Sequence, residues 1–189
     1  MQVIAGKYAG RKLASPGGSN VRPPLSRLRR AVFDTLMPFL PRGAYLDLFG
    51  GTGSFAFEAL SRGATSATVV ELNSRTAREI ESNFQLLRAD EPFRLCRGNA
   101  LNWLPKFAEE GNKFAVIGVA PPYWEDLEEQ TMAVLSPIAD KILEEDGIVF
   151  LQHPSKTPVP HDVPGLEYWK TRKYGNTTVT YYLPAPRGE

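Results

Sequence analysis

A glycine-rich turn and a Pro-Pro-Tyr segment are the two parts of this chain whose residue types could do chemistry. Residues 46 to 53 read Leu-Asp-Leu-Phe-Gly-Gly-Thr-Gly, and Glu71 closes the next apolar run. Glycines let the backbone approach a ligand closely, and an acid at the tip of the following strand can accept hydrogen bonds from ribose hydroxyls. The spacing therefore predicts a pocket for a nucleoside.

The glycine turn alone does not distinguish a dinucleotide from S-adenosylmethionine, because residues 51 to 56 also fit the Gly-x-Gly-x-x-Ala fingerprint. Asp47 favours S-adenosylmethionine, since its carboxylate can pair with the positively charged amino-acid end of that cofactor. Structural roles stay open: Asp47 as a turn acid, Glu71 as an acid at a helix N-terminus, and Asn99 as a helix cap instead of an acceptor for adenine. An NAD-dependent oxidoreductase is the minor alternative, and it would leave the Pro-Pro-Tyr segment unexplained.

Ala120-Pro121-Pro122-Tyr123 predicts methylation of an exocyclic amine, with an ordinary strand-ending turn as the alternative. Prolines lack an N–H group, so the segment presents carbonyl acceptors without competing donors. Two acceptors on the amine hydrogens would aim its lone pair at the methyl group, while Tyr123 stacks on the base. The Pro121 carbonyl is one acceptor, but Ala120 stands where a side-chain acceptor is expected. That loss costs about 1.5–3 kcal/mol, which allows slow catalysis or none.

Alternating apolar segments predict the elements that position these residues. Predicted strands cover 44–49, 66–71, 93–97, 114–119 and 147–152, and predicted helices cover 25–39, 54–62, 74–87, 100–109 and 126–143. Such alternation predicts a parallel sheet covered on both faces. Residues 166–174 and 177–183 flank Gly175-Asn176 and predict an antiparallel hairpin at the sheet edge. The predicted fold class is α/β and Rossmann-like, with a mainly parallel seven-stranded sheet whose carboxyl edge would gather the candidate residues.

Length and composition predict one domain over residues 1–189, with a basic arm and helix over 1–42 and the core over 43–189. The chain has 189 residues, of which 42% are hydrophobic and 23% charged, as is typical of a globular domain. No apolar run reaches the roughly 18 to 20 residues of a membrane span, so we expect a cytoplasmic protein, with a monomer favoured. His153 and His161 are not spaced as ligands, and no metal is expected. The single Cys96 excludes a disulfide framework.

Positive charge is concentrated at the start of the chain. Residues 1–42 hold eight Lys and Arg against one acid, Asp34, so this segment carries +7 and the remainder −6 of the net +1. Because Lys and Arg contacts to phosphates dominate nucleic-acid affinity, the asymmetry predicts a nucleic-acid partner, with ordinary solvated charge as the alternative. The segment is also rich in Gly and Pro and predicts a loop or hairpin that reaches outward.

Several segments match one pattern along nearly the whole chain: residues 1–7, 10–13, 22–23, 29–33, 47–53, 58–64 and 173–177. They resemble the RsmD family of 16S ribosomal RNA (guanine-N2)-methyltransferases. The resemblance implies a Rossmann-like methyltransferase fold, S-adenosylmethionine as the cofactor, and ribosomal RNA or the small ribosomal subunit as the partner. The implied cofactor contacts are Asp47, Phe49, Gly50, Gly51, Gly53, Glu71, Leu72, Asn99 and Ala100. The implied catalytic segment is Ala120, Pro121, Pro122 and Tyr123, and the implied RNA contacts are Lys7, Arg11, Lys12, Arg22, Pro23 and Arg29.

The chain departs from that family's pattern at six polar positions. These are Ala120, Ala115, Ser26 and Asn99 in place of Asp, Pro24 in place of Thr, and Gln152 in place of Glu. Changes spread around one crevice are typical of a diverged paralogue. Two hypotheses follow. One is an enzyme that methylates N2 of a guanine in small-subunit ribosomal RNA, and the other is a catalytically silent relative that binds RNA, S-adenosylmethionine or both as a ribosome assembly factor.

Overall fold

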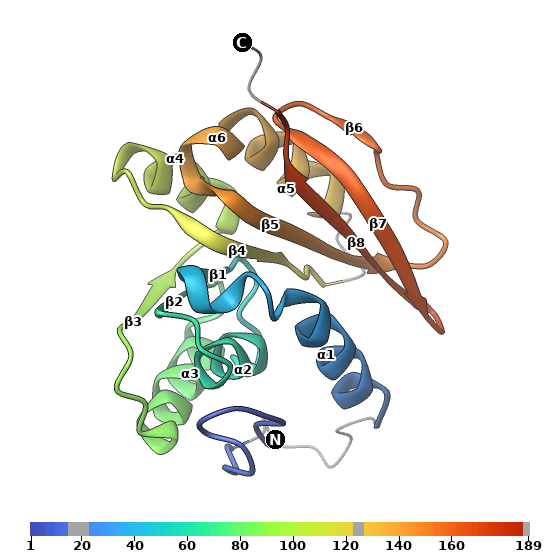
Figure 1. The fold of residues 1–189 in the computed structure, drawn as a ribbon. Helices are drawn as coiled ribbons and strands as arrows, with labels where there is room; N and C mark the ends of the chain where they lie inside the picture. The colour runs from blue at the N-terminus through green and yellow to red at the C-terminus, as the bar shows by residue number, and fades with distance from the viewer. Residues whose placement is uncertain (15–22, 123–126, 187–189) are drawn as a thin grey trace.

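The computed structural model describes residues 1–14, 23–122 and 127–186, and a single sheet forms its centre. Strand order in the sheet is β3-β2-β1-β4-β5-β8-β7-β6 (Figure 1). The parallel strands are β1 (Ala44–Asp47), β2 (Ser66–Glu71), β3 (Phe93–Arg97), β4 (Phe114–Val119) and β5 (Leu143–Pro154). β8 (Thr177–Pro184), β7 (Leu166–Tyr174) and β6 (Asp162–Val163) extend the sheet by antiparallel pairing. This arrangement confirms the predicted Rossmann-like fold with an antiparallel hairpin at its end.

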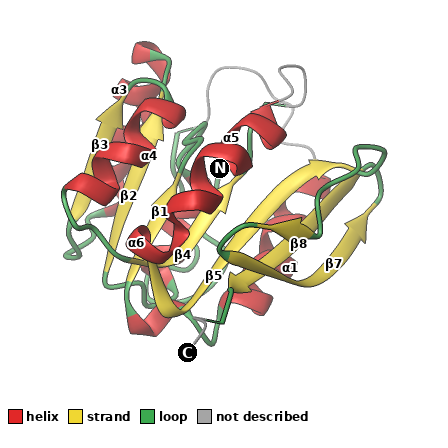
Figure 2. Cartoon of the chain, turned by 90° about the horizontal axis from the view of Figure 1, so that it is seen from above, coloured by secondary structure: helices red, strands yellow, loops and turns green. Residues whose placement is uncertain are grey.

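Helices cover both faces of the sheet, which runs from β3 on one side to β7 on the other (Figure 2). They are α1 (Pro23–Leu36), α2 (Ser54–Ser61), α3 (Ser74–Leu87), α4 (Ala100–Glu109), α5 (Leu127–Leu135) and α6 (Ala139–Ile142), with short 3-10 turns η1 (Leu40–Arg42) and η2 (Ser136–Ile138). Because successive strand residues point to opposite faces, Tyr45 joins the core beneath α1, α2 and α3, while Leu46 joins the core beneath α4, α5 and α6. None of the helices in the described ranges is long and apolar enough to cross a membrane.

Several elements differ from prediction: α1 covers Pro23–Leu36 instead of 25–39, and β1 ends at Asp47 instead of 49. The predicted helix 126–143 is divided into α5, η2 and α6, because Pro137 supplies no N–H and disrupts a regular α-helix. β5 begins at Leu143, four residues before the predicted 147, and its pairing with β4 is irregular there. The described part of the sheet has eight strands instead of seven, since β6 is only two residues long and too short to show a period in the sequence.

Residues 1–14, called here the amino-terminal arm, form a small hairpin that folds back on the body. Gln2 and Lys12 form an antiparallel bridge, and the backbone N–H of Gly10 donates to the carbonyl of Val3. Val3, Tyr8 and Leu13 are buried in the core shared with α2 and α3. The predicted hairpin is therefore present, but the expectation that it reaches outward is wrong. Docking removes the apolar side chains of the arm from water, and this burial stabilises the docked position.

Candidate active site

The carboxyl ends of three neighbouring strands bring the predicted pocket residues to one edge of the sheet. Asp47 is the last residue of β1, Glu71 is the last residue of β2, and Ala120 follows directly after β4. β1 lies between β2 and β4, and Asp47 is paired with Val69 on one side and Gly118 on the other. In an open parallel sheet this edge is where ligands bind.

The glycine turn after β1 depends on glycine at defined positions. The N–H of Gly50 donates to the carbonyl of Val70 over 2.8 Å, and a Cβ at Gly50 would lie 2.5 Å from the Val69 side chain. Gly51 and Gly53 have φ angles of +52° and +74°, a left-handed region that glycine adopts without strain. Gly53 is also the N-cap of α2. The turn thus holds backbone close to β2 and starts a helix whose N-terminus faces the same edge.

Glu71 joins the glycine turn to the end of β2. One carboxylate oxygen accepts from the N–H of Gly51 over 2.9 Å, and the other accepts from the N–H of Asn73 over 2.7 Å. The side chain is half-buried, so its oxygens keep lone pairs for a further donor such as a ribose hydroxyl. Leu72, next in the chain, is 69% exposed. It is an apolar surface beside the carboxylate.

Asp47 is a buried acid with few partners. It is 4% exposed, and its Oδ1 accepts from the N–H of Phe49 over 3.3 Å. Burial raises the pKa of Asp47 to about 7, the Phe49 N–H group lowers it, and the nearby charge of Glu71 raises it further. No ion pair joins Asp47 to a cation within the described ranges. A ligand that carries an ammonium group would supply the missing positive charge, so these residues fit the amino-acid end of S-adenosylmethionine.

Asn99 caps a helix at the end of β3. Its Oδ1 accepts from the N–H of Leu101 over 2.9 Å, and its φ and ψ of −75° and 130° are those of an N-cap. Ala100 is buried at the first position of α4. The capping alternative is therefore confirmed for Asn99. The carbonyl of Glu71 accepts from the N–H of Gly98 over 3.0 Å, so the Asn99 turn lies next to the Glu71 turn.

The Pro-Pro segment follows β4 at the same edge. Pro121 is buried, and Ala120 and Pro122 are half-buried. Tyr123 lies outside the described residues, as does Arg22. Nearby, His153 at the end of β5 is buried, with Nε2 3.0 Å from the hydroxyl of Thr180 and Nδ1 3.0 Å from the carbonyl of Pro154. Burial lowers the pKa of His153, and both ring nitrogens are engaged, in agreement with a structural role.

The predicted RNA-binding residues of the arm are held against the body. The Lys7 ammonium pairs with Asp90 at 3.2 Å and Glu91 at 3.0 Å, and the Arg11 guanidinium bonds the carbonyl of Leu87 and stacks on Tyr8. Asp90 and Glu91 belong to the connection that enters the amino end of β3. The arm's hydrogen-bonded cations therefore lie toward the edge of the sheet opposite to the pocket. Lys12 is exposed on the arm, and Pro23 is the first residue of α1.

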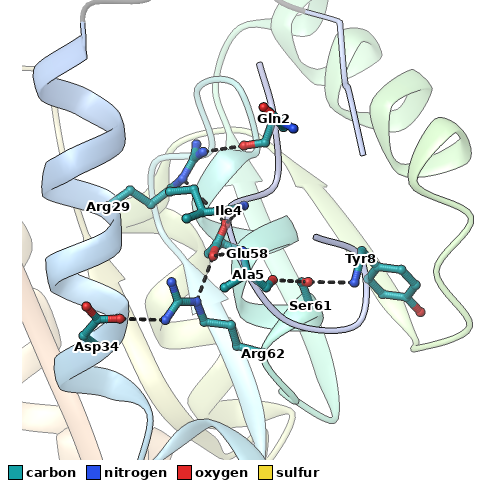
Figure 3. A network of polar contacts seen from close by, with 9 residues as sticks. All are labelled: Gln2, Ile4, Ala5, Tyr8, Arg29, Asp34, Glu58, Ser61 and Arg62. Atoms are coloured by element: carbon teal, nitrogen blue, oxygen red, sulfur yellow. Dashed lines mark hydrogen bonds and ion pairs between the residues drawn. The ribbon is translucent and has the colours of Figure 1, made fainter. Parts of the chain in front are cut away.

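The burial of Arg29 contradicts its predicted role as an RNA contact. Arg29 is 8% exposed, its Nη2 donates to the carbonyl of Gln2, and its Nε lies 3.8 Å from Glu58 (Figure 3). Burial lowers the pKa of Arg29, while Glu58 raises it. The sequence held a signal for this placement, since Arg29 shares the helical spacing of Val32, Phe33 and Leu36 and so belongs to the buried face of α1.

Glu58, which the sequence reasoning did not single out, is the centre of the contacts that hold the arm. It is 0% exposed and accepts from the N–H groups of Ile4 and Ala5 at 2.8 and 3.1 Å and from the Nε of Arg62 at 2.8 Å (Figure 3). Its position among the otherwise apolar residues 55–60 of α2 was the available signal. We call Glu58, Arg29 and Arg62 the arm clamp.

In the described residues, no group of three or more His, Cys, Asp and Glu side chains is arranged to hold a metal ion.

Comparisons with known proteins agree with this geometry. Residues 1–183 match the family model described as conserved hypothetical protein 95. The Ribosomal RNA small subunit methyltransferase D of Escherichia coli K12 is 26% identical, over 100% of this chain and 92% of the relative. The protein of the same name from Haemophilus influenzae is 29% identical, over 96% and 91%. The solved structure of a hypothetical protein from Thermus thermophilus has a TM-score of 0.81 at 29% identity, covering 98% of this chain and 99% of that one.

The match over 183 residues, the strand order and the position of the glycine turn lead to the same assignment. The structure has the fold of S-adenosylmethionine-dependent methyltransferases. The chain belongs to the family of conserved hypothetical protein 95, the RsmD-like methyltransferases.

Proposed function

We propose that this protein is a ribosomal RNA methyltransferase that transfers a methyl group from S-adenosylmethionine to N2 of a guanine in small-subunit RNA. The family and the names of its relatives support an rRNA methyltransferase that uses S-adenosylmethionine, and N2 of guanine is our proposal for the atom it methylates. The observation that carries the proposal is the placement of the Pro121-Pro122 segment beside Asp47 and the glycine turn. We place the reaction in the cytoplasm.

The pocket residues have separate tasks in this proposal. When bound, S-adenosylmethionine supplies an electrophilic methyl group on a sulfonium. Asp47 would pair with the ammonium of the amino-acid end, and Glu71 would accept from the ribose hydroxyls. The backbone of the glycine turn would lie against the cofactor, with Phe49 and Leu72 as apolar contacts and the Asn99-Ala100 turn near adenine.

The amine is activated by position and hydrogen bonds. A guanine N2 amine is a poor nucleophile because its lone pair is delocalised into the ring. The Pro121 carbonyl would accept one amine hydrogen and turn the lone pair toward the methyl group, while Tyr123 stacks on the base. The second hydrogen has no side-chain acceptor at Ala120, so we expect a slow enzyme.

Ala120 also favours a second candidate function, a catalytically silent relative that binds RNA, S-adenosylmethionine or both as a ribosome assembly factor. Calorimetric titration with S-adenosylmethionine, followed by a tritiated-methyl assay on unmodified small-subunit RNA and on the assembled particle, separates the two. Binding with methyl transfer supports the enzyme, and binding without transfer supports the silent relative. If no S-adenosylmethionine binds, the enzyme is ruled out, and the silent relative remains only as an RNA-binding protein.

A further inference from the structure

An exposed aromatic and basic surface lies between α1 and β7. We call it the α1–β7 face and define it by Met37, Phe39, Trp169, Lys170 and Arg172. Trp169 and Met37 are 41% and 42% exposed. The Trp169 ring meets Phe39 and Tyr181 edge-on at centroid distances of 6.4 and 6.3 Å. Both contacts are T-shaped and hold the ring in place, while 41% of Trp169 stays exposed.

A bulge in β7 creates this arrangement. The pairing with β8 shifts between Tyr168 and Lys170, and the extra residue, Trp169, turns to the same face as Lys170. Lys170 and Arg172 are paired with Tyr181 and Val179, whose side chains belong to the core beneath α1. Directly opposite residues share a face, so both cations lie on the α1 side of the hairpin.

The cations of this face form no ion pair in the described ranges, although one acid, Glu167, is paired with Leu183 and so also lies on the α1 side. The Lys170 ammonium lies 3.7 Å from the centroid of the Trp169 ring, and no ion pair joins Lys170 or Arg172 to a carboxylate in the described ranges. Burial lowers the pKa of Lys170, and the charge of Arg172 lowers it further. Arg27 and Arg30 are exposed on α1, three positions apart and thus on one side of the helix.

The face begins at the edge of the sheet that carries the pocket. β7 runs in the same direction as β5, because both pair antiparallel with β8. The turn at the end of β7 is bonded to the segment after β5: the hydroxyl of Ser155 donates to the carbonyl of Gly175 over 3.0 Å, and the N–H of Ser155 donates to Asn176. The row from Tyr174 through Arg172 and Lys170 to Trp169 therefore leads away from the pocket edge along one strand.

We infer that the α1–β7 face binds a single-stranded segment of the RNA whose guanine enters the pocket, with Trp169 stacking on a base and Lys170 and Arg172 contacting phosphates. This inference rests on the proposed function. Aromatic platforms combined with a basic track are the usual means of holding single strands. The arm is poorly suited to the task, because Lys7 is paired with two acids and lies toward the opposite edge.

The test measures RNA affinity separately from cofactor affinity. The probe is a fluorescein-labelled single-stranded RNA, about ten nucleotides long, followed by fluorescence anisotropy. Trp169→Ala should weaken binding about tenfold, and Trp169→Phe should restore most of the loss because Phe also stacks. The double variant K170Q/R172Q should weaken binding. It should also lower the slope of log affinity against log salt by about 1.4, because each of the two lost phosphate contacts contributes about 0.7 on a single strand. Affinity for S-adenosylmethionine should stay unchanged in all variants.

Lys173→Gln is the matched control, since it removes the same charge from the neighbouring position on the opposite face of β7. Equal losses in K173Q and K170Q would overturn the proposal and leave only a general charge effect. Wild-type RNA affinity in Trp169→Ala and in the double variant, with methyl transfer intact in the unmodified chain, would also overturn it while the proposed function stands. If the variants keep their affinity for the labelled RNA but bind the intact small subunit more weakly, the proposal is overturned, and the face contacts ribosomal protein instead. If the unmodified chain neither binds RNA nor methylates it, the proposed function itself fails.

Discussion

Asp47 links cofactor binding to pH at the scale of a single side chain. Its folded pKa of about 7 lies above the ordinary 3.8, so its contribution to stability is present at low pH and is lost as the pH rises through about 7. An ammonium-bearing ligand reverses this balance, because it stabilises the carboxylate. Without the cofactor, the fold is therefore more stable when Asp47 is protonated, although the ionised carboxylate is the form that would anchor the cofactor.

We predict that affinity for S-adenosylhomocysteine, which keeps the amino-acid end, falls by up to about tenfold per pH unit below pH 7. Asp47→Asn should remove that dependence and raise the melting temperature at pH 8, because the neutral amide avoids burying a charge. Calorimetry and thermal unfolding across pH 5 to about 8.5 provide both readouts. A pH-independent affinity in the unmodified protein would show that Asp47 does not pair with the ammonium.

Glu71 offers a second residue-scale test. Glu71→Gln keeps the shape but weakens acceptance of ribose hydroxyls, so we expect cofactor affinity to fall by about 1–3 kcal/mol. Glu79→Gln serves as the control; Glu79 lies on α3 and, among the described residues, is paired with Arg75 at 3.5 Å. Circular dichroism should confirm that the variant is folded, because Glu71 also holds the glycine turn. An affinity equal to that of the control would contradict the ribose assignment.

A substitution at Ala120 tests which groups set the rate of methyl transfer. Ala120→Asp supplies the second acceptor, and the methylation rate should rise about tenfold to a few hundredfold with little change in cofactor affinity. Ala120→Leu, which adds volume without an acceptor, should not raise the rate. The tritiated-methyl assay on small-subunit RNA measures both variants. An Asp variant that binds RNA but methylates no faster would contradict the proposed mechanism.

At the scale of elements, sequence periodicity was sufficient where an apolar run ends in a turn. The strands around the pocket and the convergence of Asp47 and Glu71 followed from such runs. Prediction failed where the deciding partner is distant in sequence. Glu58 bonds Ile4 across 54 positions, and no local pattern indicates that an arm will dock there. Arg29 is an intermediate case. Its helical spacing could have indicated the buried face, although it was interpreted as an RNA contact, but nothing local indicates the carboxylate that makes its burial tolerable.

The arm clamp predicts a large loss of stability from one substitution. Glu58→Gln leaves Arg29 buried without a full counter-charge and should destabilise the fold by about 3–5 kcal/mol. Asp34→Asn removes only the exposed partner of Arg62 and should cost less than about 1 kcal/mol. Urea unfolding of the two variants gives the comparison. A Glu58→Gln chain as stable as the Asp34→Asn chain would show that the clamp contributes little.

For the whole molecule, part of the positive charge of the first 42 residues is engaged in contacts within the protein. Lys7, Arg11 and Arg29 hold the arm to the body, so the net +7 of this segment overstates what a polyanion would meet. We therefore predict that Lys7→Gln leaves RNA affinity within about twofold of the unmodified protein, because the lost charge already faces two acids. Anisotropy with the labelled RNA measures this. A tenfold loss would restore the arm as an RNA-binding element.

The docked arm also has a consequence for the order of folding. Its contacts join Lys7 to Asp90 and Arg11 to Leu87, across 83 and 76 positions, and closing such long loops is slow because the entropy is lost before contacts compensate. During synthesis from the amino terminus, the first fourteen residues emerge well before α2 and α3 that must receive them. The arm is thus made before α2 and α3 but ordered after them, and its amides should be among the last to gain protection from hydrogen exchange in a refolding experiment.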